Sequence, residues 1–316
     1  MLPQISSEIR KLLSSFYKED KILFNNKQIE IDKNNFQPIQ PIVSSKTIAF
    51  IDGGQAEILS AGNFCLSFIR IGVNLFQDNK RIASEKREFY LFTKAKYVNS
   101  EIFYESRIFP VMGHKLVREE DLFISSNDAS IKSGLERAPI AKITNIARRL
   151  AELSLATEMQ DKVDFVVLDG TLEKTFTNEE AYLSRLKENV TALAKSSSLF
   201  TVNGNSPLIL LNKLCSEGTW SYFLENKSYF VKLHEKTKHV FRFEGNKEVL
   251  PFLVDNSSDA LFLGYPYGLI LVDQFARVSN EEKNSLKMNF LLKAENKEIA
   301  EYLNSSNAHD ILDHLG

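Results

Sequence analysis

The chain has 316 residues, of which 43% are hydrophobic and 25% charged, and this composition is typical of a soluble globular protein. The formal net charge of −2 argues against DNA binding through overall basicity, so any DNA contact needs a local channel or a partner. No apolar run approaches a membrane span and the amino terminus lacks the order of a signal peptide, so we expect a cytoplasmic protein.

The first elements lead into the main domain. A proline-containing stretch at 37–41 is expected to be extended. Before it, apolar residues at helical spacing predict an amphipathic helix with a stripe formed by Ile5, Ile9, Leu12, Leu13 and Phe16. Within residues 1–45, this stripe is available for a dimer contact or packs within its own subunit, and both alternatives stay open.

Two apolar runs end in Asp-Gly. Residues 47–54 end in Asp52-Gly53-Gly54, and residues 165–170 end in Asp169-Gly170. A short β-rich run bounded by glycine indicates a strand covered on both faces, and glycine lets the backbone turn sharply beside the acid. Two acids held this way can share a divalent cation, because Mg²⁺ and Mn²⁺ take oxygen ligands. For either motif alone, a simple turn after a core strand is the alternative.

The segment after the first acid predicts a hairpin. Residues 64–76 and 82–92 alternate in polarity and are rich in β-branched and aromatic side chains, and 77–80 join them. The polar segment 94–140 is expected to be an insertion or lid that contains one strand at 101–109.

Helices are expected on both sides of the second acid. Apolar spacing predicts one at 143–153, and a Thr-Asn-Glu-Glu start predicts another from 178 to 194. The order of a strand, a hairpin, a helix and an acid-bearing strand indicates an α/β fold with a ribonuclease H-like mixed sheet and flanking helices. The first and fourth strands then lie side by side, and their carboxylates meet at one edge.

The chain beyond residue 201 is β-rich and aromatic. Three short strands are expected at 220–224, 229–233 and 239–243. Basic residues lie among these aromatics, namely Lys232, His234, Lys236, Lys238, His239 and Arg242. This pattern suits single-stranded DNA, with bases on rings and phosphates on cations. The alternative, which the pattern favours, is a half-buried sheet with a solvated basic face.

The last part of the chain carries another acid and a charged tail. The apolar run 260–263 is followed by Tyr265 and, after a further apolar stretch, by Asp273. A helical tail is expected from 281 to 303 within the unit 281–316. His309 with Asp310 could ligate a metal, although a solvated helix end is the alternative, and His314 lies in the same short terminal segment.

Taken in order, five short motifs resemble the NurA nucleases over residues 46–280. They are Ile51-Asp52-Gly53-Gly54, Ala151-Glu152, Leu168-Asp169-Gly170-Thr171-Leu172, Ala194-Lys195-Ser196 and Gly264-Tyr265-Pro266 with Asp273 following. The resemblance implies a ribonuclease H-like, Mn²⁺-dependent DNA nuclease, with Mg²⁺ as the alternative ion. It also implies a homodimer that works with HerA, a hexameric ATPase, in processing DNA ends.

The resemblance also implies roles for individual residues. Asp52, Asp169 and Glu152 become metal ligands, and Tyr265 lies near the scissile phosphate. Glu152 is one helical turn from Arg148, so an exposed ion pair is its alternative. The candidate DNA-binding residues are Lys195, Arg148 and Arg149, and a solvated helix end is the alternative for Lys195.

One position departs from the family pattern. Some relatives have a histidine eight residues after the tyrosine, where this chain has Asp273. An aspartate can ligate Mn²⁺ or orient a water, but it cannot act as an imidazole acid near neutral pH. The resemblance implies a DNA exonuclease or endonuclease, with a 5′-to-3′ exonuclease as one form. The alternatives are a non-catalytic DNA clamp for the ATPase and, with less support, an actin-like ATPase, which needs further glycine-rich loops.

Overall fold

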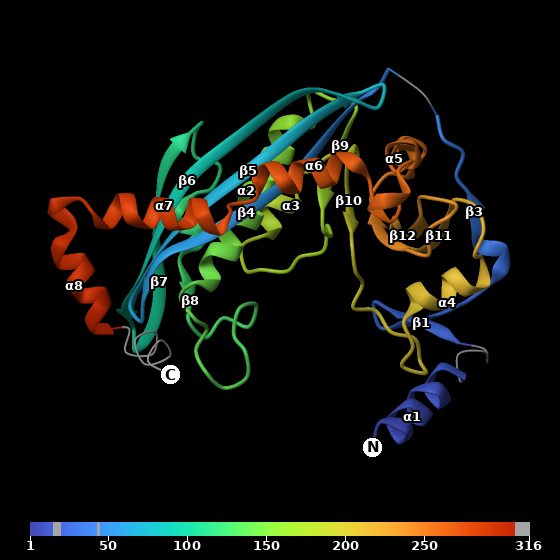
Figure 1. Ribbon diagram of the computed structural model, residues 1–316, viewed down its shortest axis with the longest axis horizontal. Helices are drawn as coiled ribbons and strands as arrows, with labels where there is room; N and C mark the ends of the chain where they lie inside the picture. Colours follow the sequence, from blue (N-terminus) through green and yellow to red (C-terminus); the bar gives the residue numbers. More distant parts are fainter. Residues whose placement is uncertain (15–19, 43–44, 307–316) are drawn as a thin grey trace.

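The computed structural model describes residues 1–14, 20–42 and 45–306 as a mixed α/β fold (Figure 1). One sheet has the order β3-β11-β12-β13-β10-β9-β4-β5-β6-β7-β8, and β1 and β2 form a separate hairpin. The strands are β1 (Lys21–Phe24), β2 (Lys27–Glu30), β3 (Phe36–Pro38), β4 (Thr47–Ala61), β5 (Phe64–Gln77), β6 (Lys80–Val98), β7 (Glu101–Met112), β8 (Ile124–Ser125), β9 (Phe165–Asp169), β10 (Val190–Ala194), β11 (Trp220–Glu225), β12 (Ser228–Lys232) and β13 (Phe241–Glu244). The helices are α1 (Leu2–Ser14), α2 (Lys142–Met159), α3 (Glu180–Leu183), α4 (Pro207–Leu214), α5 (Leu250–Asn256), α6 (Tyr267–Ala276), α7 (Asn280–Leu291) and α8 (Lys297–Ser306).

The middle of the sheet has the predicted ribonuclease H-like order. β4, β5 and β6 are antiparallel neighbours, whereas β9 and β10 continue the sheet as parallel strands on the other side of β4. The first and fourth strands of this core, β4 and β9, lie side by side with Ile51 opposite Leu168. The next residue of each strand, Asp52 and Asp169, therefore reaches the same place in the sheet.

The hairpin of β5 and β6 is confirmed and is longer than expected. Gln77 pairs with Lys80, and the two residues between them, Asp78 and Asn79, have positive φ angles of 49° and 57°. Two consecutive residues with positive φ form a two-residue hairpin turn whose twist matches that of the flanking strands.

The segment 94–140 differs from the expected lid. β6 runs through its first residues and pairs with β7, so this part extends the sheet. The residues that follow β7 contribute Leu116, Leu122 and Ile124 to the largest core cluster. The sequence conceals this because one face of β6 and β7 is exposed, and charged residues such as Lys94 occupy alternate positions there.

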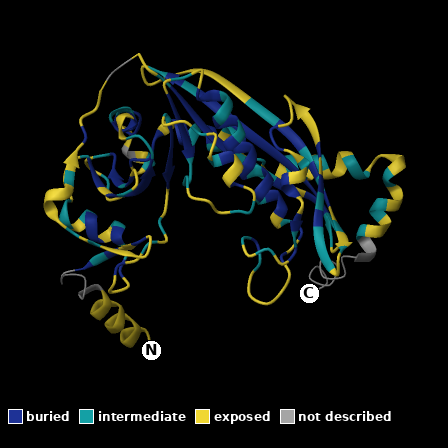
Figure 2. Ribbon diagram, turned by 180° about the vertical axis from the view of Figure 1, so that it is seen from behind, coloured by how far each residue is buried: buried dark blue, intermediate teal, exposed yellow. Residues whose placement is uncertain are grey.

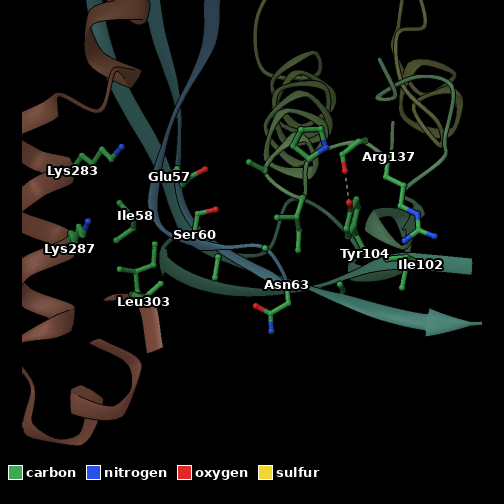
Figure 3. A pocket seen from close by; sticks show the side chains of 18 of the residues that line it. Glu57, Ile58, Ser60, Asn63, Ile102, Tyr104, Arg137, Lys283, Lys287 and Leu303 are labelled. Carbon is green, nitrogen blue, oxygen red and sulfur yellow. Dashed lines mark hydrogen bonds between the residues drawn. The ribbon is translucent and has the colours of Figure 1, made fainter. Parts of the chain in front are cut away.

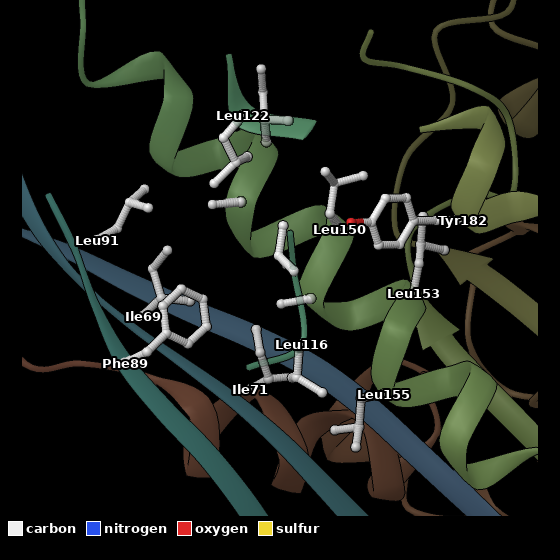
Figure 4. Close-up of a cluster of buried hydrophobic side chains, with 14 of the residues drawn as sticks. Ile69, Ile71, Phe89, Leu91, Leu116, Leu122, Leu150, Leu153, Leu155 and Tyr182 are labelled. Atoms are coloured by element: carbon white, nitrogen blue, oxygen red, sulfur yellow. The ribbon is translucent and has the colours of Figure 1, made fainter. Parts of the chain in front are cut away.

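Two hydrophobic layers flank the sheet. α2 covers one face and packs on inward side chains of β5 and β6 such as Ile71 and Leu91 (Figure 4). α5 and α6 cover the other face, where Phe50 of β4 and Leu269 of α6 belong to one cluster. Full burial of such a side chain contributes about 1.5–3 kcal/mol, so these layers hold β4 and β9 in place. Figure 2 shows the middle strands buried between them.

The helix predicted for 178–194 is wrong. Only Glu180–Leu183 of α3 is helical, and Val190–Ala194 forms β10, which pairs in parallel with β9 and is buried along its whole length. A short apolar run has no period that separates a fully buried strand from a buried helical segment. The pairing with β9, which the local sequence does not contain, decides between them.

The three strands expected after residue 201 are confirmed as β11, β12 and β13, but two of their basic residues face inward. Lys232 is fully buried and donates to the backbone carbonyls of Ser216, Gly218 and Glu235. Arg242 is buried beside Glu244, with 2.9 Å between Nη2 and Oε1. These two cations therefore belong to the interior and present neither a solvated basic face nor a DNA surface.

The apolar run 260–263 forms a turn, whereas the further apolar stretch before Asp273 lies on α6 with Leu269 and Val272 buried. Residues Ala260–Phe262 form a 3-10 turn in which Leu261 is 83% exposed, and Asp273 lies on α6. A run of only four apolar residues between turn signals does not distinguish a strand from an exposed turn.

The outer helices agree with the sequence. α1 is confirmed, and Ile5 and Ile9 on its stripe are about half exposed, so this face is not part of the described core. Phe16 lies outside the described residues, as do His309, Asp310 and His314. α7 and α8 form the expected tail.

Among the described residues, no helix combines the length and apolar character needed to cross a membrane. The division of the chain into residues 1–45, 46–280 and 281–316 stays a prediction.

Candidate functional site

The two Asp-Gly motifs come together but have different local structures. Asp169 is the last residue of β9, and Gly170 after it has a φ of +117°, which suits the predicted turn. Asp52 lies in the middle of β4, which continues through Gly53 and Gly54 to Ala61. The sharp turn expected after Asp52 is therefore wrong, because β5 pairs with β4 along its whole length.

The glycines after Asp52 allow close packing instead of a turn. A Cβ on Gly53 would lie 2.5 Å from Glu152 Oε1 and 2.8 Å from Arg148 Cγ. A Cβ on Gly54 would lie 2.1 Å from the backbone oxygen of Ala276, at the end of α6. Gly53 thus admits the Glu152 carboxylate toward the sheet, and Gly54 admits α6 against the other face.

Glu152 is a buried acid of α2, so the alternative of an exposed ion pair with Arg148 is wrong as to exposure. Its side chain is 5% exposed, and its Oε1 accepts a hydrogen bond of 2.9 Å from Arg148 Nη1. The same nitrogen donates to the Gly53 carbonyl at 2.9 Å and lies 4.0 Å from Asp52 Oδ1. The ion pair with Arg148 is confirmed, but the helix is buried around most of its circumference, so the pair faces the carboxylates.

Burial and nearby like charges disfavour the ionised forms of the carboxyl groups of Asp52 and Glu152. Burial raises the pKa of Asp52 to about 8, and the charges of Glu152 and Asp169 contribute in the same direction. Burial likewise raises the pKa of Glu152, although the charge of Arg148 opposes this. Like charges that are held together out of water favour either a proton or a bound cation.

Lys195 and Tyr265 both contact Asp169. Lys195 follows β10, and its Nζ donates to Asp169 Oδ2 at 2.5 Å. Burial opposes the charge of Lys195, but the hydrogen bond and charge of Asp169 prevail, so its pKa rises. The buried Tyr265 hydroxyl lies 3.0 Å from Asp169 Oδ1 and 3.1 Å from the Leu193 carbonyl. Burial and the charge of Asp169 raise the pKa of Tyr265 well above its ordinary value, so it stays protonated near neutral pH.

Asp273 lies beside this group and is bound elsewhere. Its Oδ2 accepts a hydrogen bond of 2.6 Å from Arg277 Nη2, one turn along α6, and its side chain is 35% exposed. Its charge still acts on Lys195 and Tyr265 and raises the pKa of each, which places it at the margin of the cluster.

Arg149, a candidate DNA-binding residue, has its guanidinium bound to other groups of the protein and is not exposed for a DNA contact. It is buried, and its guanidinium donates to Glu179 Oε1 at 2.7 Å and to the Thr171 carbonyl at 2.6 Å. Consecutive residues of a helix point about 100° apart, so Arg148 and Arg149 cannot both face Gly53. Arg149 is therefore a positioning residue for the loop after β9.

Two buried acids next to the site were missed from the sequence. Glu179 accepts hydrogen bonds from Arg149 and from the backbone amides of Thr175 and Phe176, and so fixes the loop after Asp169. Glu244 accepts one of 2.6 Å from the Leu172 amide. The Thr-Asn-Glu-Glu pattern was a signal for Glu179, because acids at helix starts often bind free amides.

The donor set suits a hard cation, although it is not a ready-made cage. Among the described residues, no three His, Cys, Asp or Glu side chains form a group that could hold a metal ion as they stand. Arg148 and Lys195 hold one carboxylate each, and these ion pairs occupy oxygens that a cation would need. The three carboxylates supply only oxygen donors, which Mg²⁺ and Mn²⁺ prefer.

Comparison with known proteins identifies a family and several solved structures to which the chain is similar. The NurA domain family matches residues 46–278. The chain is similar to the crystal structure of the NurA nuclease from Sulfolobus solfataricus, with 15% identity, a TM-score of 0.52 and coverage of 98% of this chain and 97% of that chain. Endonuclease V from Ciona intestinalis, in complex with DNA, has 10% identity, a TM-score of 0.43 and coverage of 79% and 92% respectively. No match is found among curated proteins.

Proposed function

The chain belongs to the NurA family, and on this basis we propose that it is a DNA nuclease that hydrolyses phosphodiester bonds at Asp52, Glu152 and Asp169. The convergence of these three carboxylates from β4, α2 and β9 carries the proposal, since burial and mutual repulsion, which raise the pKa of Asp52 to about 8, would be relieved by a bound cation. The Sulfolobus protein with the same fold is named a nuclease.

Asp52, Glu152 and Asp169 would hold a divalent cation, Mn²⁺ or alternatively Mg²⁺, with Asp273 as a weaker contributor from the margin. Such an ion, when bound, supplies a Lewis acid for the phosphate and lowers the pKa of water. The three acids would lose their mutual repulsion on binding it, and Asp52 would release its proton.

The remaining residues would position the acids and the phosphate. Tyr265 holds Asp169 by a hydrogen bond and, because it stays protonated, does not act as a base. Lys195 is half exposed, so its ammonium can leave Asp169 for the phosphate and neutralise charge that builds on it. Arg148 holds Glu152 and the Gly53 carbonyl, and about a third of its side chain is exposed.

We also propose a homodimer that docks on a HerA-like hexameric ATPase. A chain of net charge −2 has little general attraction for DNA at physiological salt, so a partner would help to retain the substrate. The exposed side chains of Ile5 and Ile9 on α1 offer a surface for a two-fold contact or for docking. Light scattering with and without residues 1–20, followed by co-purification with the cognate ATPase, tests both parts. A monomer that degrades DNA at full rate and ignores the ATPase would contradict them.

The nuclease proposal is tested on end-labelled single-stranded and double-stranded DNA with Mn²⁺, Mg²⁺ or EDTA. We expect cleavage with Mn²⁺ and none with EDTA. Asp52→Ala and Asp169→Ala should each reduce the rate by about a thousandfold or more while the protein stays folded, since each removes a ligand. Near-full activity in either folded variant would refute the site, and a wild type that binds DNA without cleaving it would be a clamp.

A further inference from the structure

The edge of β4 is open next to the carboxylates. β9 pairs with β4 only as far as Ile51, so in the described part of the chain the stretch from Gly53 to Ala61 has β5 on one side and no strand on the other. An open edge presents unpaired backbone donors and acceptors. The Gly53 carbonyl, the first on this edge, already accepts a hydrogen bond from Arg148.

A groove follows this edge away from the site. Arg148, Asn145 and Lys142 occur every three residues on α2, and Gln55 of β4 donates a hydrogen bond to Asn145. A hollow of about 260 Å³ beside Gln55, Lys142 and Asn145 adjoins a larger cavity of about 1140 Å³, because both are lined by Glu57. The larger cavity continues past Ser60 to Asn63, at the tip of the β4–β5 hairpin.

Most residues that line this β4 groove, which runs from Gln55 to Asn63, are apolar, but its charged side chains are mainly cations. Figure 3 shows Lys283 and Lys287 extending from α7 toward β4, with Arg137 on the other side of the strand. None of these three, nor Lys142, forms an ion pair with another described residue. Among the described residues, Glu57 is the one acid of the lining. In a chain of net charge −2, the groove is therefore a local basic surface.

We propose that the β4 groove binds a single strand of DNA, the part of the substrate that continues beyond the phosphate at the carboxylates. This inference rests on the proposed function of that site. Phosphates would lie against Lys283 and Lys287 of α7 and against Arg137, while the open edge of β4 offers hydrogen bonds that do not depend on base sequence.

The dimensions of the groove favour one strand over two. Eight steps of β-strand from Gln55 to Asn63 extend about 26 Å. At 3.4 Å or more per nucleotide, this length holds on the order of four to eight nucleotides of one strand. A cavity of 1140 Å³ between two protein walls has room for a few nucleotides and not for a duplex.

The test measures binding of single-stranded oligonucleotides of 4, 8 and 16 nucleotides by fluorescence anisotropy in EDTA, where cleavage does not interfere. Lys283→Glu with Lys287→Glu should weaken binding of the 16-mer by about tenfold or more at low salt. It should also reduce the dependence of log affinity on log salt by about 1.4, since each lost phosphate contact contributes about 0.7. The double arginine variant, K283R/K287R, should bind like wild type.

Lys80→Glu with Arg81→Glu is the matched control. These cations follow the turn at the far end of the same sheet and undergo the same change of charge. The control should bind like wild type. If both double reversals weaken binding equally, or if K283E/K287E changes neither affinity nor salt dependence, the proposal is overturned. Failure of wild type to bind any of the oligonucleotides overturns it as well.

Two parallel measurements separate the remaining possibilities. Light scattering on the same samples reports whether K283E/K287E changes the mass of the particle. A changed mass with unchanged DNA affinity would mean that a second copy of the chain occupies the groove, and it would overturn the proposal. Cleavage by wild type with Mn²⁺ decides the proposed function alone: absence of cleavage with the predicted binding pattern refutes the nuclease and leaves the groove in place.

Discussion

Substitution of Gly53 by alanine should separate activity from stability. The new Cβ would lie 2.5 Å from Glu152 Oε1 and 2.8 Å from both Arg148 Cγ and Ile71 Cδ1. Ordinary contact begins near 3.4 Å, so the glutamate oxygen must retreat by about 0.9 Å and the other two atoms by about 0.6 Å. All three belong to side chains, which can move, so we expect a loss of unfolding free energy of about 1–3 kcal/mol.

The activity of Gly53→Ala should fall much further. A displacement of about 1 Å of a catalytic group can cost on the order of a hundredfold in rate, and Glu152 is the group displaced. Gly62→Ala is the matched control for stability, because its Cβ meets no atom within 4 Å, and it should leave the unfolding free energy unchanged. Gly54→Ala should instead impair folding, since its Cβ falls 2.1 Å from a backbone oxygen.

The assay combines urea denaturation with steady-state cleavage of labelled DNA in Mn²⁺ for these three variants. A Gly53→Ala protein whose kcat/KM stays within about threefold of wild type would refute the reasoning, because Glu152 would then tolerate displacement. Loss of stability without loss of activity would show that Gly53 serves packing alone.

Three further outcomes follow from the same contacts. Asp52 has a folded pKa of about 8 against an ordinary 3.8, so the folded state holds the proton more tightly and loses stability as pH rises through this window. Without metal, the stability that Asp52→Asn gains over wild type should therefore grow from about pH 5 to pH 8. A constant difference in denaturation midpoint over this range would contradict the prediction. Lys195→Ala should reduce cleavage by on the order of a hundredfold and stability by less than about 1 kcal/mol, since its ion pair is half exposed; equal cleavage rates would exclude a role in the reaction. Asp273→Asn should weaken Mn²⁺ activation less than Asp169→Asn does, and an unchanged Mn²⁺ titration would make Asp273 a surface acid.

The sequence predicts the central strands because their apolar runs are continuous. The Asp-Gly runs identified β4 and β9, and their place in the order of elements predicted that the two lie side by side. The helical spacing of apolar residues correctly predicted α2, because one face of this helix packs on the sheet. By contrast, β10 was taken as helix, since five buried residues carry no period of their own.

The site was less accessible than the fold, because its geometry depends on contacts between distant segments. The burial of Glu152 requires the absence of a side chain at Gly53, nearly 100 positions away in the sequence. Similarly, Arg149 resembles Arg148 in sequence, and only the position of Glu179 shows that its guanidinium is already bound. The groove along β4 has no local motif, since its cations come from α2, α7 and the loop before α2.

Anomalous scattering from Mn²⁺ in crystals of this protein tests the central claim most directly, because it locates the ion independently of activity. We predict a peak in contact with the carboxylate oxygens of Asp52, Glu152 and Asp169, with Lys195 displaced from Asp169. The peak should be absent from Asp169→Ala crystals soaked in the same way. A peak elsewhere, or none at this cluster in crystals of an enzyme that Mn²⁺ activates, would contradict the account.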